Sequence, residues 1–468
     1  MANRFVPAAN STSGASGFAD TGNGGINRLQ SLQRDWTKQL APSGISRRSP
    51  TIPPSVIFPV LVLLLISVTF GSRGEGRGID SQSAIRLAGY GLAAVSVLFA
   101  LGLRQLTLNW SMLSWLLVPI FIIGTALYAL EPTFALAAGL AHLALLLFAW
   151  RLVARLGQLR IALALVIAGL IIGALSVYAY FFWPEIGQAS AALAGSDVGI
   201  RMRGVTAQPN SLGVISALTI LLAVMHFRAF TIRQRVLVGV AILMASFCLI
   251  YSDSRTNIAA LALCLLLWVV CRANAAINLF VVAGIALSAC LVTVFVPDVS
   301  AYLSRSGSSE EIASLNGRSR IWDVAWEHIY AHPFLGQGYG SSRLLLPQDD
   351  RLFDAALNTH NLYLELLVSG GIALLALFVL AVAIALIRSA RARRVDGMIA
   401  LLFFLIRGIA EVAPYGGLPS LPAFAFYFAV AVCIASAQSP HRRATKSLKP
   451  EFNRYPRGGD ALALPARR

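Results

Sequence analysis

The sequence has little charge: only 13% of its 468 residues are Asp, Glu, Lys or Arg, while 57% are hydrophobic. About a quarter of the residues in a soluble globular protein are charged, so this chain has too few charges to cover a water-exposed surface. The shortage excludes a soluble enzyme, a disordered protein and a nucleic-acid binder, although 38 basic residues face 21 acidic ones. We therefore predict an all-α polytopic integral membrane protein, because the apolar runs are long enough for helices and too long for barrel strands.

Cysteine is also scarce, and none of the five cysteines has metal-ligand spacing. All five lie in apolar stretches, which predicts packing residues and neither a disulfide framework nor a zinc site. The first 50 residues contain no apolar run of the kind found in a signal peptide. We expect residues 1–50 and 438–468 to be disordered, basic cytoplasmic tails.

Twelve apolar segments approach the roughly 17–25 residues that a membrane-spanning helix needs. They are 52–70, 84–103, 110–130, 133–150, 161–182, 211–227, 236–252, 256–271, 276–296, 361–387, 397–413 and 420–437. Helices 1–9 are thus predicted within 51–296 and helices 10–12 within 361–437, separated by one large loop over 297–360. Inside that loop, residues 319–331 have apolar side chains at helical spacing, which predicts an amphipathic helix at the membrane interface.

The positions of the basic residues predict the orientation. With the N-terminus inside the cell, most Lys and Arg fall in inner segments, while most Asp and Glu fall in outer segments or spans. This is the asymmetry of the positive-inside rule. We therefore predict a multi-pass membrane protein with both termini cytoplasmic and the large loop on the outer side of the membrane.

Polar residues on the predicted outer face gather in five short segments. These are Arg201, Arg203, Gln208 and Asn210; Asp253, Ser254 and Arg255; Arg318 and Arg320; His332 with Gly336, Gly338 and Gly340; and Asn358, His360, Asn361 and Glu365. Arginine binds diphosphate oxygens bidentately and keeps its charge. His360 stands at a loop-to-helix junction and is an acid–base group at neutral pH. The combination predicts group transfer from a lipid-linked diphosphate, with His360 taking a proton from an incoming hydroxyl.

The four clusters other than the one around His360 also have a structural interpretation. For Arg201 and Arg203 the default interpretation is that of solvated loop charges. Arg255 can snorkel to lipid headgroups, and Arg318 with Arg320 can anchor the loop to lipid phosphates. The glycines of GQGYG lack the preceding strand and the following Lys-Ser/Thr of a phosphate-binding loop, so they do not predict a nucleotide site.

Four sequence blocks resemble the O-antigen ligase and polysaccharide polymerase family of bacterial inner membranes. They are RGVTAQPNSLG (203–213), SDSRTNIAALAL (252–263), GRSRIWDVAWEHIYAHPFLGQGYG (317–340) and NTHNLYLELLVSGG (358–371). In the last block, His360 and Asn361 are followed by nine residues and Gly371, as in the family. Leu374 stands where the family usually has a small residue, which departs from the ligase branch in particular.

The resemblance implies a GT-C-like membrane protein that performs metal-independent, inverting glycosyl transfer at the periplasmic face without a cofactor. The implied donor is an oligosaccharide on undecaprenyl diphosphate, and the acceptor is another lipid-linked glycan or the lipid A core. His360 is implied to be the base. The residues implied to bind the diphosphate or substrate, or to shape the loop over the site, are Arg201 or Arg203 together with Arg255, then Arg318, Arg320, His332 and Asn361.

Three functions remain open from the sequence. Leu374 and the GRSRIW form of the loop are more similar to exopolysaccharide polymerases, so we expect polymerisation of exopolysaccharide or O-antigen repeat units. The alternatives are an O-antigen ligase and a transporter, for which Glu365, Arg407 and Glu411 are the main charged candidates. Arg407 and Glu411 are four residues apart, which predicts a structural ion pair on one helix. Expected partners are membrane lipids and a chain-length regulator, and no nucleic acid.

Overall fold

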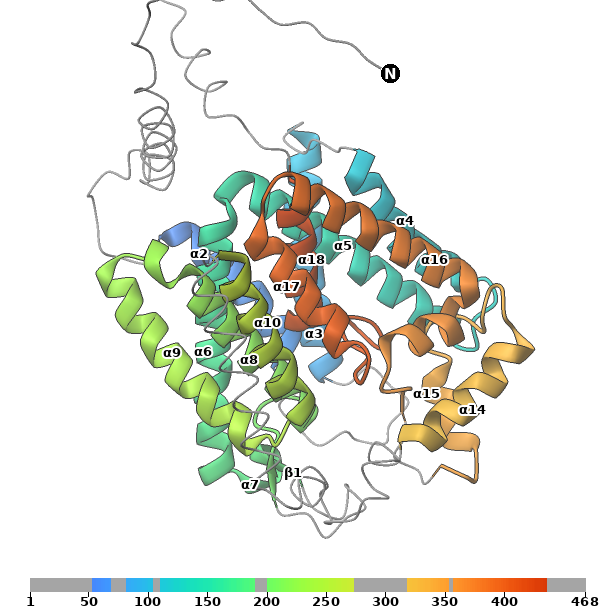
Figure 1. The fold of residues 1–468 in the computed structure, drawn as a ribbon. Helices are drawn as coiled ribbons and strands as arrows, with labels where there is room; N and C mark the ends of the chain where they lie inside the picture. The colour runs from blue at the N-terminus through green and yellow to red at the C-terminus, as the bar shows by residue number, and fades with distance from the viewer. Residues whose placement is uncertain are drawn as a thin grey trace, which may run out of the picture. The chain divides into compact units, whose positions relative to one another are not determined.

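The computed structural model describes residues 53–68, 81–103, 110–189, 200–272, 318–352 and 357–435, and this part of the chain is almost entirely helical (Figure 1). The helices are α2 (Pro54–Ser67), α3 (Ser81–Gly102), α4 (Trp110–Thr125), α5 (Pro132–Leu156), α6 (Gln158–Phe182), α7 (Pro184–Gly187), α8 (Pro209–His226), η2 (Phe227–Ala229), α9 (Ile232–Tyr251), α10 (Arg255–Arg272), α14 (Arg318–Ala331), α15 (Ser342–Leu345), η3 (Leu346–Gln348), α16 (Leu362–Arg391), α17 (Val395–Arg407) and α18 (Leu421–Ile434). Two short strands, β1 (Gln188–Ala189) and β2 (Arg201–Met202), pair antiparallel.

The helices confirm the predicted class of an all-α polytopic membrane protein. Within the described residues, 7 helices are long and apolar enough to cross a membrane, namely α3, α5, α6, α8, α9, α10 and α16. Three further apolar helices, α2, α4 and α18, are shorter. Every predicted span except 276–296, which lies outside the described residues, overlaps one of the helices, although 397–413 extends past the end of α17 at Arg407. The total of twelve spans stays a prediction.

Helix α18 lies at the centre of the bundle, and each of its residues is buried. It packs against α2, α5, α6, α8, α16 and α17. Small residues let neighbouring helices approach closely, as they do in membrane bundles. A Cβ atom at Gly169 of α6 would lie 1.9 Å from the hydroxyl oxygen of Thr219 in α8.

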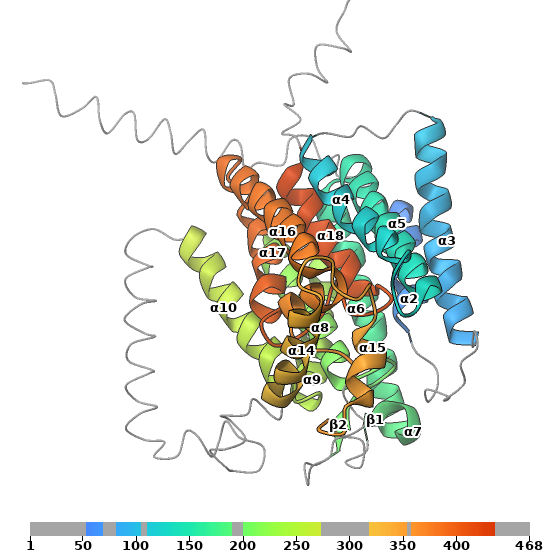
Figure 2. The same ribbon diagram turned by 90° about the vertical axis from the view of Figure 1, so that its right-hand side faces the viewer.

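The outer helices expose apolar side chains. Helices α3 and α10 stand on opposite sides of the bundle (Figure 2). On α3, Val95, Leu98 and Phe99 are more than 60% exposed, and on α9 Leu243 is 73% exposed. Water would penalise such surfaces, whereas lipid tails match them.

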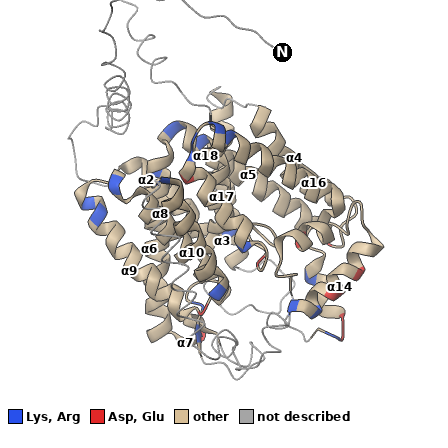
Figure 3. Cartoon of the chain, in the orientation of Figure 1, with Lys and Arg blue, Asp and Glu red and all other residues tan. Residues whose placement is uncertain are grey.

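Charges divide the bundle into two ends (Figure 3). Arginines gather at one end, at the junctions of α5 with α6, α8 with α9 and α16 with α17. Asp396 of α17 lies among them, 2.7 Å from Arg272 and 4.0 Å from His226. The opposite end carries α7 and α14, where acidic and basic residues are mixed. This is the asymmetry from which the orientation was predicted.

Helix α16 is broken at Gly371, which has φ 61° and ψ −161°. The turn after α14 fills the break and satisfies the freed backbone groups through four hydrogen bonds. These are Ile372 N to Pro333 O (2.8 Å), Ala373 N to Phe334 O (3.2 Å), Gln337 N to Val368 O (2.8 Å) and Gly338 N to Ser369 O (3.0 Å). The sequence predicted one continuous span over 361–387, which is wrong at this point, because the apolar pattern continues across the break.

Helix α14 confirms the helix predicted over 319–331. Its apolar face packs against the first half of α16, where Ala325 and Ile329 form a small core with Leu364 and Val368. Trp322 donates a hydrogen bond to the Thr359 carbonyl at 2.9 Å. The helix therefore fixes the segment that precedes α16, which contains His360.

Candidate active site

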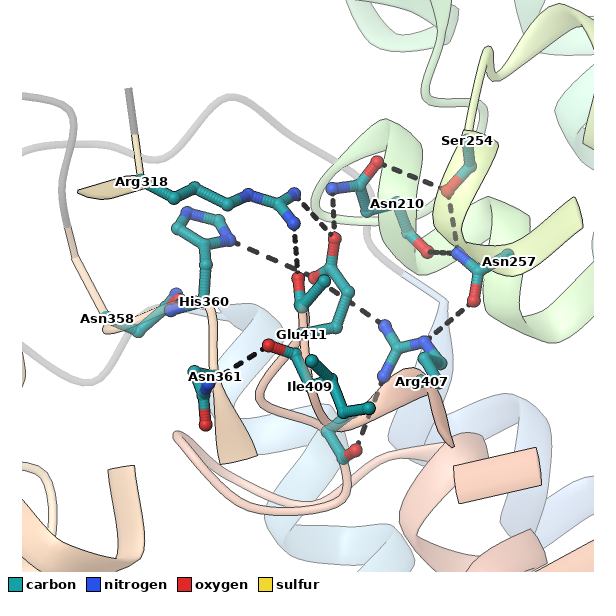
Figure 4. A network of polar contacts seen from close by, with 12 residues as sticks. Asn210, Ser254, Asn257, Arg318, Asn358, His360, Asn361, Arg407, Ile409 and Glu411 are labelled. Atoms are coloured by element: carbon teal, nitrogen blue, oxygen red, sulfur yellow. Dashed lines mark hydrogen bonds and ion pairs between the residues drawn. The ribbon is translucent and has the colours of Figure 1, made fainter. Parts of the chain in front are cut away.

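A buried carboxylate, Glu411, stands at the centre of a polar cluster at the mixed-charge end of the bundle (Figure 4). Its Oε1 atom accepts hydrogen bonds from Asn210 Nδ2 at 2.6 Å and from Arg318 Nη2 at 3.1 Å. Its Oε2 atom lies 3.7 Å from Arg407 Nη2 and 3.9 Å from His360 Nδ1. The cluster thus joins the first turns of α8, α14 and α16 to the end of α17.

The loop after α17 holds Glu411 in place, because its backbone is bonded from outside. Three successive carbonyls accept hydrogen bonds: Gly408 O from Leu362 N (2.8 Å), Ile409 O from Asn361 Nδ2 (3.0 Å) and Ala410 O from Arg318 Nη1 (2.5 Å). Further along, Tyr339 of the GQGYG turn donates to the Gly417 carbonyl at 2.9 Å. The loop is therefore tied to the two segments that match the third and fourth sequence blocks.

His360 stands directly before α16 in a left-handed backbone conformation, with φ 49°. Its amide donates to the Asn358 side chain at 3.1 Å, which forms a tight local turn. Asn361 then caps the helix by accepting from the amides of Tyr363 and Leu364 at 2.9 and 3.1 Å. Backbone strain of this kind gathers at functional sites, and here it presents a side chain that is 23% exposed.

The charge balance of the cluster favours anions. Burial by itself raises the pKa of the Glu411 carboxyl, but the neighbouring His360 and the charges of Arg407 and Arg318 outweigh burial and lower it to about 2. Glu411 is therefore ionised at physiological pH and is too weak a base to take a proton from a hydroxyl. Among the described residues in and beside the cluster, four arginines (Arg201, Arg255, Arg318 and Arg407) outnumber three carboxylates (Asp253, Glu365 and Glu411).

The structure separates the two candidate arginines of the first block. The Arg201 guanidinium donates to the Ser252 and Asp253 carbonyls and to Asn210 Oδ1, the last at 3.1 Å. Arg201 is thereby joined to Glu411 through Asn210. Arg203 turns away and donates to the backbone carbonyls at 185 and 186, at 2.6 and 2.8 Å.

The other predicted residues lie at different distances from Glu411. Arg318 and Asn361 contact the cluster directly. Arg255 lies beside it, 39% exposed and 3.4 Å from Asp253. Arg320 is exposed on α14, and His332 is exposed just beyond the opposite end of that helix from Arg318, roughly 20 Å along its axis.

The sequence predicted Glu411 only as the partner of Arg407 and not as a residue of the site around His360. The predicted Arg407–Glu411 ion pair is confirmed at 3.7 Å, but α17 ends at Arg407, so the two residues do not share a helix. Arg407 is also bound to Asn257 of α10 at 2.7 Å. The sequence RGIAE (407–411) places two opposite charges at the end of a long apolar run, which marks Glu411 as unusual. Its other partners could not be found in this way, because they come from segments far away in the chain.

Glu365, the other candidate for ion coupling, is buried in the first turn of α16. It accepts hydrogen bonds from Ser342 Oγ at 2.5 Å and from the Thr359 amide at 3.2 Å. These contacts give it a structural role beside His360. Among the residues that the structure describes, no group of three or more His, Cys, Asp or Glu side chains could hold a metal ion.

The fold and the cluster define a polytopic helical membrane protein with an arginine-rich site that contains His360 at one end of the bundle. Residues 240–379 match the family model described as O-antigen ligase, which confirms the resemblance seen in the sequence blocks. This segment of the chain is similar to the O-antigen ligase family, and the match supports a glycosyl transfer role in polysaccharide or lipopolysaccharide assembly. The matched segment contains Arg255, Arg318 and His360 but neither Arg201 nor Glu411. No curated protein matches the chain.

Proposed function

We propose that the protein polymerises repeat units of an exopolysaccharide or O-antigen by transferring a glycan from undecaprenyl diphosphate, with His360 as the base. One observation carries the proposal: His360 is a partly exposed histidine beside a buried carboxylate, at the edge of a cluster with excess positive charge. An incoming hydroxyl needs a base, and a departing diphosphate needs cations. The base, His360, and the cations, which are the arginines, all lie in or beside this cluster.

The basic end of the bundle supports the orientation. If the arginines at the α5–α6, α8–α9 and α16–α17 junctions face the cytoplasm, the cluster faces the periplasm. Both termini are then cytoplasmic, and the protein is a multi-pass protein of the inner membrane. A lipid-linked donor anchored in the outer leaflet could reach the cluster at that face.

The proposed reaction is a single displacement. The oxygen of the acceptor hydroxyl attacks the anomeric carbon of the donor sugar, and the bond from that carbon to the diphosphate oxygen breaks. The electron pair leaves with undecaprenyl diphosphate, and the hydroxyl proton passes to His360 Nε2. Attack from the face opposite the leaving group inverts the anomeric configuration, and no metal takes part in these steps.

Three arginines are proposed to bind the diphosphate. Arg201, Arg255 and Arg318 lie in or beside the cluster, and guanidinium groups stabilise the charge that develops on a departing diphosphate. Arg201 is favoured over Arg203 because only Arg201 is bonded to the residues around Glu411. Asn361 serves as the cap that aims His360.

The acceptor separates polymerase from ligase. Leu374, the departure from the ligase pattern, is completely buried and packs against Gly370, so it touches no acceptor. The preference for a polymerase therefore rests on the resemblance of the sequence blocks. Transfer to the lipid A core is the second candidate, favoured by the family description of the matched segment. A chain-length regulator stays a proposed partner.

The test uses a deletion strain complemented with the wild-type protein, His360→Ala or His328→Ala, with equal amounts in the membrane. His328 lies on the same end of the bundle but contacts Gln337, so it is the matched control. Loss of secreted high-mass polymer with normal lipopolysaccharide, for His360→Ala alone, supports a polymerase. Loss of O-antigen from lipid A core with accumulation of lipid-linked chains indicates a ligase. Full polymer and full O-antigen with His360→Ala would contradict both and favour a transporter.

A further inference from the structure

We infer that Glu411 is the positioning residue for His360: its carboxylate aims the imidazole, with Nε2 toward the acceptor hydroxyl, and stabilises the imidazolium formed when His360 takes the proton. This inference rests on the proposed function and adds a residue that lies outside the segment matched by the family model. The arrangement is that of a base oriented by a carboxylate on its second ring nitrogen.

The first argument is the state of His360 Nδ1. This nitrogen is buried and has no hydrogen-bond partner within the described residues. The group it faces is Glu411 Oε2, at 3.9 Å, roughly 1 Å beyond a hydrogen bond. A buried donor without a partner is costly, and catalytic hydrogen bonds often tighten only when substrate is bound. A small movement of the imidazole completes the pair.

The second argument is that the two carboxylate oxygens of Glu411 have different contacts. Oε1 is occupied by Asn210 and Arg318, both at hydrogen-bond distance. Within the part of the chain that the structure describes, Oε2 has only the two longer contacts, to Arg407 at 3.7 Å and to His360 at 3.9 Å. One oxygen therefore anchors the carboxylate, and the other keeps capacity for the imidazole.

The third argument is that both partners are held rigidly. The loop that carries Glu411 is bonded through three successive carbonyls, and the backbone of His360 is fixed between Asn358 and Asn361. Because both backbones are held in place, only the imidazole side chain has to move for the pair to close. The low pKa of Glu411 keeps the carboxylate ionised beside the imidazole.

The test compares Glu411→Gln, Glu411→Asp and Glu365→Gln in a transfer assay with purified protein and a lipid-linked donor, measured across pH. We expect Glu411→Gln to lower kcat roughly 100-fold or more while the KM for the donor stays close to wild type. The groups facing the carboxylate are His360, Arg407 and Arg318. Removing the anion disfavours the imidazolium, so the acid limb of the pH–rate profile should move to lower pH.

The two other variants separate charge from structure. Glu411→Asp keeps the anion and should keep the acid limb near its wild-type position with a reduced rate. Glu365→Gln removes another buried carboxylate, which hydrogen-bonds to Thr359 and acts on His360 through charge alone, so it should move the limb less than Glu411→Gln does. The inference is overturned if Glu411→Gln retains the acid limb of the wild-type protein or raises only the KM for the donor. In that case Glu411 positions the arginines and not His360.

A compensating substitution covers the case in which the Glu411→Gln protein does not fold. Glu411→Gln leaves the buried Arg407 without its counter-ion, which is destabilising. In a double variant, Arg407→Gln removes that charge, and the pH profile is measured on whichever of the two proteins folds. His360→Ala distinguishes the two levels of the argument. An active His360→Ala protein sinks the proposed function, whereas an inactive one beside a Glu411→Gln protein of wild-type profile sinks only this inference.

Discussion

At the residue scale, the two arginines of the first sequence block show how neighbours in sequence acquire different surroundings. Arg201 and Arg203 are two residues apart at strand β2, and residues of an extended chain that are two apart start on the same face. The strand ends between them, and the chain turns at Gly204, which has φ 57°. Arg201 reaches the turn between α9 and α10, whereas Arg203 reaches the end of α7.

This difference predicts unequal effects of two matched substitutions. We expect Arg201→Ala to lower kcat/KM for the lipid-linked donor about 10- to 100-fold, because a charged hydrogen-bonding group contributes roughly 1.5–3 kcal/mol. Arg203→Ala should change kcat/KM little, since its guanidinium is occupied by two backbone carbonyls away from Glu411. The measurement is steady-state transfer at several donor concentrations, with membrane insertion checked for both proteins. A larger loss for Arg203→Ala would reverse the assignment.

The sequence identified most residues of the candidate site but not the contacts between them. The four blocks identified His360, Arg318 and Arg201 as candidates, because polar groups are rare in an apolar chain. Glu411 was interpreted only as the partner of Arg407, because a spacing of four residues satisfies a simple local rule. Its contacts to Asn210, Arg318 and His360 depend on how α8, α14 and α16 pack, and no local pattern encodes that packing.

At the element scale, the broken helix α16 explains the nine-residue spacing between Asn361 and Gly371 in the fourth sequence block and its contact with the third block. The nine residues between Asn361 and Gly371 form the first half of the helix, with His360 before its N-terminus. Gly371 ends this half in a conformation that glycine adopts readily, and the HPFLG turn occupies the space beside it. Helix positions were predictable from hydrophobic runs, whereas the break was missed, although the Ser-Gly-Gly sequence at 369–371 is a signal for a kink.

The break predicts a sharp contrast between two glycine substitutions. A Cβ atom at Gly371 would lie 2.3 Å from the Phe334 carbonyl carbon and oxygen, and the residue has a positive φ. We expect Gly371→Ala to cost roughly 3 kcal/mol or more of stability, combining backbone strain with overpacking. Gly91→Ala on α3 meets nothing within 4 Å and should be neutral or slightly stabilising. Thermal unfolding of both proteins in detergent checks the contrast, and equal melting temperatures would contradict it.

At the scale of the whole molecule, the two ends of the bundle carry different chemistry. One end is rich in arginine, and Arg272 and Asp396 tie α10 to α17 there. The other end holds the cluster around Glu411 together with α14. Such a division was predictable from composition, because the positive-inside rule depends only on the number of basic residues in each loop. Which blocks would meet at the second end was not predictable, since that depends on the packing of α8, α10, α14 and α16.

The division predicts which end is reached from the periplasm. In a protein whose native cysteines are replaced, Arg320→Cys marks the exposed side of α14 and Arg233→Cys marks the exposed start of α9. In cells with a permeabilised outer membrane, a membrane-impermeant maleimide should label Arg320→Cys and leave Arg233→Cys unlabelled until the inner membrane is lysed. The reason is that basic loops are retained on the cytoplasmic side. The reverse pattern would place the His360 cluster in the cytoplasm, where a donor in the outer leaflet could not reach it, and would contradict the proposed periplasmic reaction.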